Sequence, residues 1–306
     1  MASDNVNAMN VVLSNGEYVR VDKKSHPDLF WALRGGGGGN WGVIVYFHLQ
    51  LTVLSNKITT FGYTVPRNLF DDFFEQWQNY VPGSPKALSF ANVYATGKEA
   101  YLSGWYLGTV VDLEALMRDN IPSLNSEGVD SEVKNVAFDM GVWAEGNGNE
   151  KIPFHAASHV VSRLLSQEAW SVLFDNLDAI SDENGYIILD PYGGRMSEIP
   201  VESSAFPYRK GVLFTIQYQA TESKPTKWLE KFYNEMTKFV GAKSYVNYPS
   251  VLLGTFTANS TGTVQAGSLW NDRYFTPEYY QRLVKIKTMY DPSNFFRFPQ
   301  SIPVKK

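Results

Sequence analysis

A run of five consecutive glycines between a predicted helix and a predicted strand places the tightest constraint on how this chain folds. The run occupies residues 35–39. Ahead of it, Pro27 and Asp28 are typical of the first turn of a helix, because proline fits the first helical position and an acidic side chain favours the positive end of the helix dipole. After it, residues 43–51 carry apolar side chains at every second position, which is the period of a strand. The order is therefore helix, glycines, strand.

That order excludes a dinucleotide-binding Rossmann loop, although residues 37–42 satisfy the pattern G-x-G-x-x-G. A Rossmann loop needs a strand before the glycines and a helix after them, because the helix N-terminus receives the pyrophosphate. Two other reasons for so many glycines remain equally open. Either the backbone has to approach a flat ligand closely, or the turn between helix and sheet is too crowded for side chains.

The rest of the sequence predicts an α+β fold. Asn15 and Gly16 separate two short apolar runs, which is the strongest short-range signal for a β-hairpin. Thr276 and Pro277 suit the cap and the first position of a last helix. Apolar periodicity predicts further helices at residues 68–81, 166–180 and 225–240, and further strands at residues 88–95, 101–107, 185–189, 212–219 and 244–248.

Composition excludes several classes of partner and site. The 306 residues carry a net charge of −4 without a long basic run, so no binding to nucleic acid is expected. No apolar run is long enough to cross a bilayer, and no membrane interaction is expected. The chain has no cysteine. His155 and His159 lie four residues apart but lack the glutamate of a zinc-protease helix, so we expect structural or surface histidines and no metal site.

Several short motifs follow one another in a specific order along the chain. They are DNV at residues 4–6, HPDLFWALRG with the following NWG at residues 26–42, PYGG at 191–194, AFPYR at 205–209, YVNY at 245–248, and YDPSNFFR with QSIP between residues 290 and 303. Together they resemble the berberine-bridge-enzyme-like family of FAD-linked oxidoreductases over nearly the whole chain.

This resemblance implies an α+β fold with a partial FAD-binding domain of the PCMH type. It also implies a substrate domain in which an antiparallel sheet is backed by helices. Residues 1–55 are expected to form the second part of the FAD-binding domain. Residues 56–252 are expected to form the substrate domain, and residues 253–306 a C-terminal segment that returns to the FAD-binding domain.

The resemblance implies FAD as the cofactor and a small molecule as the substrate. It places the flavin contacts at Asp4, Asn5, Val6, Gly35, Gly36, Gly37, Gly38, Gly39, Asn40 and Asn294. Tyr248 or Tyr245 is the candidate base that removes a hydroxyl proton. Gln217 stands where relatives place a polar or acidic active-site residue, and Thr215 shares its strand face. Because a glutamine cannot accept a proton as a carboxylate does, we expect oxidation of an alcohol or sugar by hydride transfer to flavin.

The chain also departs from the family pattern. The family's glycine-rich pyrophosphate loop and flavin-bonding histidine do not occur in this sequence, and Tyr208 stands where many relatives carry histidine. We therefore expect the C-terminal part of a longer flavoprotein, for which the family implies secretion. A glycosylation sequon at residues 259–261 is compatible with secretion, but the sequence begins without a signal peptide.

The alternative is a truncated, non-catalytic remnant, or one piece of a split flavoprotein that acts through a missing N-terminal segment or a partner chain. In that case, strands near residues 9–21 and 43–51 would present unpaired sheet edges and exposed apolar surface.

Overall fold

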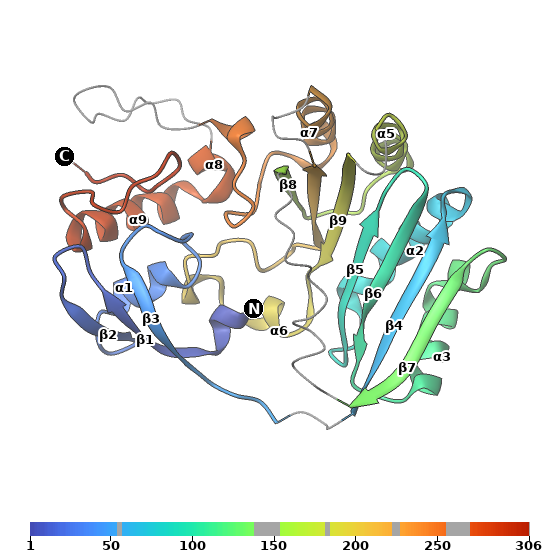
Figure 1. The fold of residues 1–306 in the computed structure, drawn as a ribbon, viewed down its shortest axis with the longest axis horizontal. Helices are drawn as coiled ribbons and strands as arrows, with labels where there is room; N and C mark the ends of the chain where they lie inside the picture. Colours follow the sequence, from blue (N-terminus) through green and yellow to red (C-terminus); the bar gives the residue numbers. More distant parts are fainter. Residues whose placement is uncertain (54–56, 138–153, 181–183, 222–226, 255–269, 306) are drawn as a thin grey trace. The chain divides into compact units, whose positions relative to one another are not determined.

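The structure is a computed structural model that describes residues 1–53, 57–137, 154–180, 184–221, 227–254 and 270–305 (Figure 1). Its contacts divide the chain into two compact units. The first unit comprises Met1–Thr52, Glu198–Lys210 and Lys243–Lys306, and the second comprises Val53–Ser197 and Gly211–Ala242. The glycosylation sequon lies outside the described residues.

The division differs from the boundaries expected from the sequence in two short segments. Residues 198–210 and 243–252 were expected in the substrate domain, but they pack with the first unit. The first of these segments is held by α1 (Pro27–Leu33), because Ala205 N donates to Trp31 O at 3.2 Å. The second is held near α8 (Trp270–Tyr274), because Ser244 N donates to Arg273 O at 2.9 Å. These long-range backbone bonds leave no mark in the local sequence.

The first unit is built on a three-stranded antiparallel sheet. The strands are β1 (Val6–Val12), β2 (Tyr18–Asp22) and β3 (Val43–Leu49), in the order β2-β1-β3. The Asn15-Gly16 hairpin joins β1 to β2 as predicted, with Gly16 at φ 86°. The helix α1 contacts β2 and the long helix α9 (Pro277–Tyr290). Thr276 caps α9 by accepting a hydrogen bond from Tyr279 N, which confirms the predicted start of this helix.

The strand β3 forms an edge of this sheet and is exposed along most of its length. Val43, Phe47 and Leu49 each expose more than half of their surface, and Tyr46 exposes 62%. A natural edge strand is normally protected by charge, proline or a covering element. The alternating pattern of residues 43–51 predicted this strand correctly. Its exposed apolar side chains are those expected if the chain is a remnant or one piece of a split flavoprotein. The strand β1, by contrast, is paired on both sides.

The second unit is built on a seven-stranded antiparallel sheet with helices on one face (Figure 1). The strand order is β7-β4-β6-β5-β9-β10-β8. The strands are β4 (Lys57–Pro66), β5 (Leu88–Ala95), β6 (Glu99–Tyr106), β7 (Asp130–Ala137), β8 (His155–Val161), β9 (Gly185–Pro191) and β10 (Phe214–Ala220). The helices are α2 (Phe70–Tyr80), α3 (Val110–Asn120), α5 (Gln167–Asp178) and α7 (Lys227–Val240), with the short α6 (Gly194–Glu198) at the boundary of the unit.

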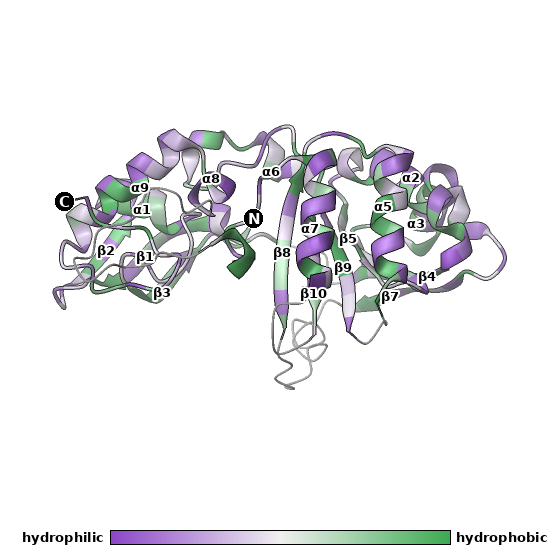
Figure 2. Cartoon of the chain, turned by 90° about the horizontal axis from the view of Figure 1, so that it is seen from above, coloured by the Kyte–Doolittle hydropathy of each residue, from purple (hydrophilic) through white to green (hydrophobic). Residues whose placement is uncertain are grey.

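Alternation along each strand divides the residues of this sheet between two faces. Phe214, Ile216 and Tyr218 of β10 are fully buried on the face that carries the helices. Phe214 contacts Trp77 of α2 at 5.1 Å between ring centroids, and Tyr218 contacts Phe232 of α7 at 4.6 Å. Both α5 and α7 carry hydrophobic and hydrophilic segments in Figure 2, as expected for helices with one buried side. The core of the second unit lies between these helices and the sheet.

One local prediction was wrong. Residues 244–248 were predicted as a strand but form a turn, in which Tyr248 N donates to Tyr245 O at 3.0 Å. Pro249 lacks the N–H needed to continue a ladder, which explains the difference. His155 and His159 lie on β8, and His159 is fully buried, as expected for a structural histidine. Four residues along a strand span about 13 Å, too far for two ligands of one metal ion.

Candidate functional site

The glycine-rich loop forms one wall of a pocket within the first unit. The pocket has a volume of about 200 Å³. Its lining comes from three stretches of sequence: Gly36, Gly37, Gly38 and Asn40; Val246, Asn247 and Pro249; and Trp270, Tyr274, Phe275, Phe298, Gln300 and Ile302. Small-molecule sites typically measure roughly 300–1,000 Å³, so this pocket can hold only part of a ligand as large as FAD.

The structure separates the two explanations for the glycine run. A side chain at Gly35 would overlap the backbone of Phe206, and one at Gly36 would lie 2.8 Å from Ala32 O. Gly37 and Gly39 have φ values of 85° and 72°, which favour glycine. Gly38 has neither constraint, since a Cβ there would meet no atom within 4 Å. Crowding explains Gly35 and Gly36, and backbone conformation explains Gly37 and Gly39. Only Gly38 is left for a closely approaching ligand.

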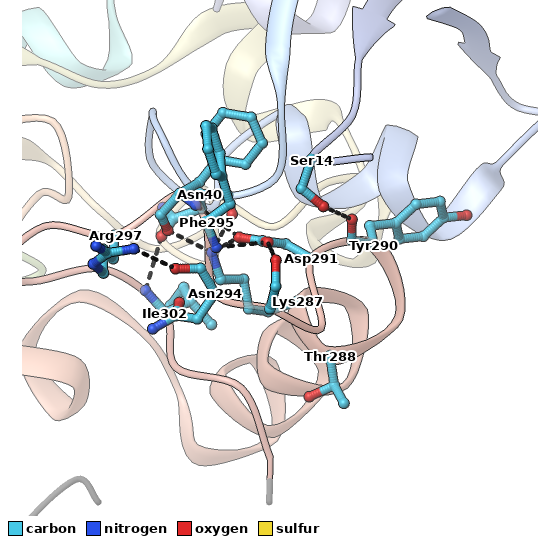
Figure 3. Close-up of polar contacts among 12 residues, drawn as sticks. Ser14, Asn40, Lys287, Thr288, Tyr290, Asp291, Asn294, Phe295, Arg297 and Ile302 are labelled. Atoms are coloured by element: carbon cyan, nitrogen blue, oxygen red, sulfur yellow. Dashed lines mark hydrogen bonds and ion pairs between the residues drawn. The ribbon is translucent and has the colours of Figure 1, made fainter. Parts of the chain in front are cut away.

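Asn40 fixes the end of the loop to the C-terminal segment. Its Nδ2 donates to Gly38 O at 3.1 Å, and its Oδ1 accepts from Ile302 N at 2.8 Å. Its backbone oxygen accepts a hydrogen bond of 2.6 Å from Nζ of Lys287, which is fully buried (Figure 3). The same Nζ donates to Asp291 Oδ2 at 2.6 Å and to a backbone oxygen at 2.5 Å. Helix α9 therefore holds the glycine loop through one buried lysine.

Lys287 and Asp291 each stabilise the charged form of the other. Burial alone would raise the pKa of Asp291, but hydrogen bonds from Lys287 and from the backbone N–H groups of Phe296 and Phe295 outweigh it. The pKa of Asp291 therefore lies below its ordinary value of 3.8. Burial lowers the pKa of Lys287, and the hydrogen bond and charge of Asp291 oppose this shift. Asp291 is thus ionised at neutral pH and balances the charge of the lysine.

Acid should weaken the first unit through Asp291. Because the folded-state pKa is depressed, its stabilisation is fully present above the unfolded-state pKa of about 4 and is lost as the pH falls through the lower folded value. The urea midpoint of the unmodified chain should therefore fall between about pH 6 and about pH 3 by more than that of Asp291→Asn, which lacks this titration. Parallel pH profiles for the two proteins would contradict this role of the carboxylate.

Asp4 and Asn5 belong to a short 3-10 helix (Ala2–Asn5) directly before β1, Val6 is the first residue of β1, and none of the three lines the pocket. The Asp4 carboxylate accepts two hydrogen bonds from the buried guanidinium of Arg209, at 2.6 and 2.9 Å. Burial raises the pKa of Asp4, but Arg209 and the amino terminus lower it by more. Asn5 O accepts from the backbone N–H of Gln50 at 2.7 Å. Asp4 is therefore engaged in an ion pair within the first unit.

Asn294 is a half-buried residue with two unusual features. Its φ is 54°, in the left-handed region that asparagine tolerates better than most residues. Its Oδ1 is buried and has no hydrogen-bond partner among the described residues. Buried polar atoms are nearly always hydrogen-bonded, so an acceptor of this kind fits a ligand donor. Asn294 is not among the residues that line the pocket, and its role as a flavin contact stays a prediction.

The candidate base tyrosines share one turn of the first unit. The rings of Tyr245 and Tyr248 lie 5.1 Å apart in an edge-to-face contact, and Asn247 Nδ2 donates to Tyr245 OH at 2.7 Å. Both tyrosines are half-buried. The pocket is lined by Val246 and Asn247 from the same turn and not by the tyrosines themselves.

Gln217 and Thr215 belong to the second unit, on β10. Their register on β9 pairs Thr215 with Asp190 and Gln217 with Ile188, so both side chains lie on the sheet face opposite the helices. This confirms the expectation that they share a face. Both are buried, at 1% and 5% exposure.

Sequence reasoning missed the aromatic part of the pocket. Phe298, Trp270, Tyr274 and Phe275 line it but were not predicted as site residues. Tyr274 OH donates to Gln300 Oε1 at 3.2 Å, and Gln300 Nε2 donates to Gly254 O at 2.7 Å. The dense aromatic spacing of residues 270–298 was the available signal, but burial in a core gives the same pattern.

Among the described residues, no three histidine or acidic side chains are grouped as ligands for a metal ion. In the same part of the chain, no helix has the length and apolarity required to cross a membrane.

Comparison with known proteins relates these features to one family. Residues 244–303 match the family described as "Berberine and berberine like". The chain is 32% identical to berberine bridge enzyme-like D-2 from Nicotiana tabacum, over 99% of this chain and 62% of that protein.

Solved structures agree with the sequence matches. The Bermuda grass isoallergen BG60 superposes with a TM-score of 0.87 at 29% identity, covering 100% of this chain and 66% of that one. Phl p 4, a grass pollen allergen with glucose dehydrogenase activity, superposes with a TM-score of 0.86 at 27% identity, covering 99% and 66%. The chain spans less than two thirds of the length of the curated relatives, and matches their C-terminal part. By its motifs, its fold and these matches, the chain belongs to the berberine-bridge-enzyme-like family.

Proposed function

We propose that this chain is part of an FAD-dependent oxidoreductase that oxidises an alcohol or a sugar-type small molecule. The observation that carries the proposal is the pocket lined by the glycine backbone of residues 36–38 together with the aromatic side chains of Trp270, Phe275 and Phe298. Such a slot suits a flat aromatic ring system. The glucose dehydrogenase activity named for Phl p 4 supports a sugar-type substrate.

When bound, the flavin supplies the redox chemistry, and the protein supplies position, a base and electrostatics. The glycine loop would lie against the cofactor, and Asn294 Oδ1 would accept a hydrogen bond from it. Tyr248 or Tyr245 would take the proton of the substrate hydroxyl. Gln217 can donate or accept a hydrogen bond but cannot act as the base, which leaves proton removal to a tyrosine.

The exposed strand β3 favours a second candidate function. Its free edge and apolar side chains suit pairing with a further polypeptide segment, so the chain would act as one piece of a flavoprotein completed by another segment or partner. The match covers 62% of the Nicotiana tabacum relative, and the remainder of that protein provides segments to test.

Visible absorption of the purified chain tests the proposal. After incubation with FAD and gel filtration, alone and after co-expression with the unmatched N-terminal part of a relative, a flavin spectrum should elute with the protein. In the flavin-loaded protein, Tyr248→Phe should lower turnover of a sugar by at least about 100-fold while leaving the flavin content unchanged. A chain that stays colourless in both preparations would sink the oxidoreductase proposal, and unchanged turnover would remove Tyr248 from the mechanism.

A further inference from the structure

The strand β3 is the one exposed sheet edge in the described part of the chain that carries no charged residue. It pairs with β1 alone and ends its sheet. The opposite edge of that sheet, β2, carries Arg20 and Asp22. In the other sheet, the edge strand β7 carries two acidic residues and a lysine, and the edge strand β8 is buried over most of its length. Charges protect natural edges against further pairing, so only β3 is left open to it.

The uncharged stretch extends well beyond the strand itself. Between Gly35 and Asn56 the sequence contains no acidic or basic residue and no proline. Of the devices that protect an edge, β3 has a shift in its register with β1, between Ile44 and Tyr46. Tyr46 and Phe47 are neighbours that point to opposite faces, and they expose 62% and 56% of their surface. The edge is therefore apolar on both faces of the sheet.

The exposed apolar surface of β3 has the size of a small protein–protein interface. Val43, Val45, Phe47 and Leu49 each expose about half of their surface, and Tyr46 exposes more. Half-exposed side chains of this kind offer on the order of 100 Å² each, so five of them in each of two copies amount to on the order of 1,000 Å². Specific interfaces begin near this size. The patch therefore fits a reversible dimer with a dissociation constant in about the micromolar range.

We infer that β3 pairs in the antiparallel direction with the β3 strand of a second copy of this chain, about a two-fold axis at Tyr46. Tyr46 is the middle residue of Val43–Leu49, so this axis pairs the strand over its whole length. Each Tyr46 then lies opposite its counterpart, Val45 lies opposite Phe47, and Val43 lies opposite Leu49.

A second copy suits this edge because a two-fold interface has to be complementary to itself. In an uncharged strand no like charges meet across the axis, and pairs of aromatic and β-branched side chains stabilise neighbouring strands. The free N–H and C=O groups of each β3 would find partners in the other copy. This inference rests on the second candidate function and names its partner.

Sedimentation velocity and light scattering of the full chain, at about 1 to 100 µM, would measure the association. The unmodified chain should form a dimer. Tyr46→Lys should weaken the dimer by at least about 10-fold, because two like charges would lie opposite each other, and Tyr46→Glu should do the same. An equimolar mixture of these two variants should associate at least about 10-fold more tightly than either variant alone, because opposite charges then meet at the axis.

The matched control is Tyr18→Lys on the opposite edge of the same sheet, because Tyr18 is a tyrosine of β2 that exposes 55% of its surface. It should change the dissociation constant by less than about twofold, and all three variants should keep the melting temperature of the unmodified chain within about 2 °C. A monomer at the highest concentration would overturn the inference. So would a dimer that Tyr46→Lys leaves unchanged, or a mixture of the two Tyr46 variants that associates no better than its components.

Two further measurements separate this inference from the proposals on which it builds. A one-to-one complex with the unmatched N-terminal part of a relative, formed in place of the dimer, would overturn the inference and support the second candidate function. Flavin content is read from the visible spectrum of the same samples. A dimer that depends on Tyr46 but takes up no FAD in either preparation would support this inference and contradict the proposed oxidoreductase, and a flavin-loaded monomer would do the reverse.

Discussion

Replacing Lys287 by methionine should lower the free energy of unfolding by about 3–5 kcal/mol, the largest effect that we expect from a single substitution. The ammonium group has no exposed surface and donates to Asn40 O, Asp291 Oδ2 and Phe296 O. Methionine has a similar length but no donor, so three buried acceptors, one of them charged, lose their partner. Urea unfolding followed by tryptophan fluorescence would measure the loss.

The matched control is Lys285→Met in the same helix, because Lys285 is exposed. Its free energy of unfolding should stay within about 0.5 kcal/mol of the unmodified chain. Adding Asp291→Asn to Lys287→Met should recover part of the loss, because the buried negative charge is removed as well. A shift in Lys287→Met no larger than in Lys285→Met would show that the buried pair does not hold the glycine loop.

Gly35→Ala should lower the free energy of unfolding by about 1–3 kcal/mol. The added Cβ would overlap the backbone nitrogen of Phe206 and lie 2.9 Å from its Cα. Backbone atoms cannot move aside as the end of a flexible side chain can, and Phe206 itself is buried at 1% exposure. Chemical unfolding of the purified variant would measure the effect.

Gly38→Ala is the control within the same loop, and its expected phenotype is different. Because a Cβ at Gly38 meets no atom within 4 Å, the free energy of unfolding should change by less than about 0.5 kcal/mol. The methyl group would instead project from the pocket wall, and flavin retained after gel filtration should fall. Destabilisation of Gly38→Ala by as much as Gly35→Ala would mean that crowding explains the whole glycine run. Full flavin retention would argue against close approach of the ligand at Gly38.

The elements that could be predicted are those whose signal is local. The Asn15-Gly16 turn, the cap formed by Thr276 and Pro277, and the alternation along residues 43–51 each report a preference set within a few residues. The turn at residues 244–248 was missed because two tyrosines and a valine favour a strand, while Pro249 and the bond from Ser244 to Arg273 favour a turn. The latter contact spans 29 residues of sequence.

The candidate site shows the same limit. Motif order identified the glycine loop and the family, and strand periodicity placed Gln217 and Thr215 on one face. The sequence could not reveal that Asp4 forms an ion pair with Arg209, or that Asp190 lies between Asn92 and Thr215. Those contacts join residues separated by 205 and 98 positions in the chain.

The sequence by itself determined the α+β class, most of the helices and strands, and the family, because dihedral preferences, apolar periodicity and short motifs are written in neighbouring residues. Only the tertiary structure decided which glycines are crowded and which one is open to a ligand, where the charges of Lys287 and Asp4 are balanced, and which polar side chains meet on the sheet. The physical reason is that burial, overlap and ion pairing depend on atoms brought together from distant parts of the chain, and no local pattern records them.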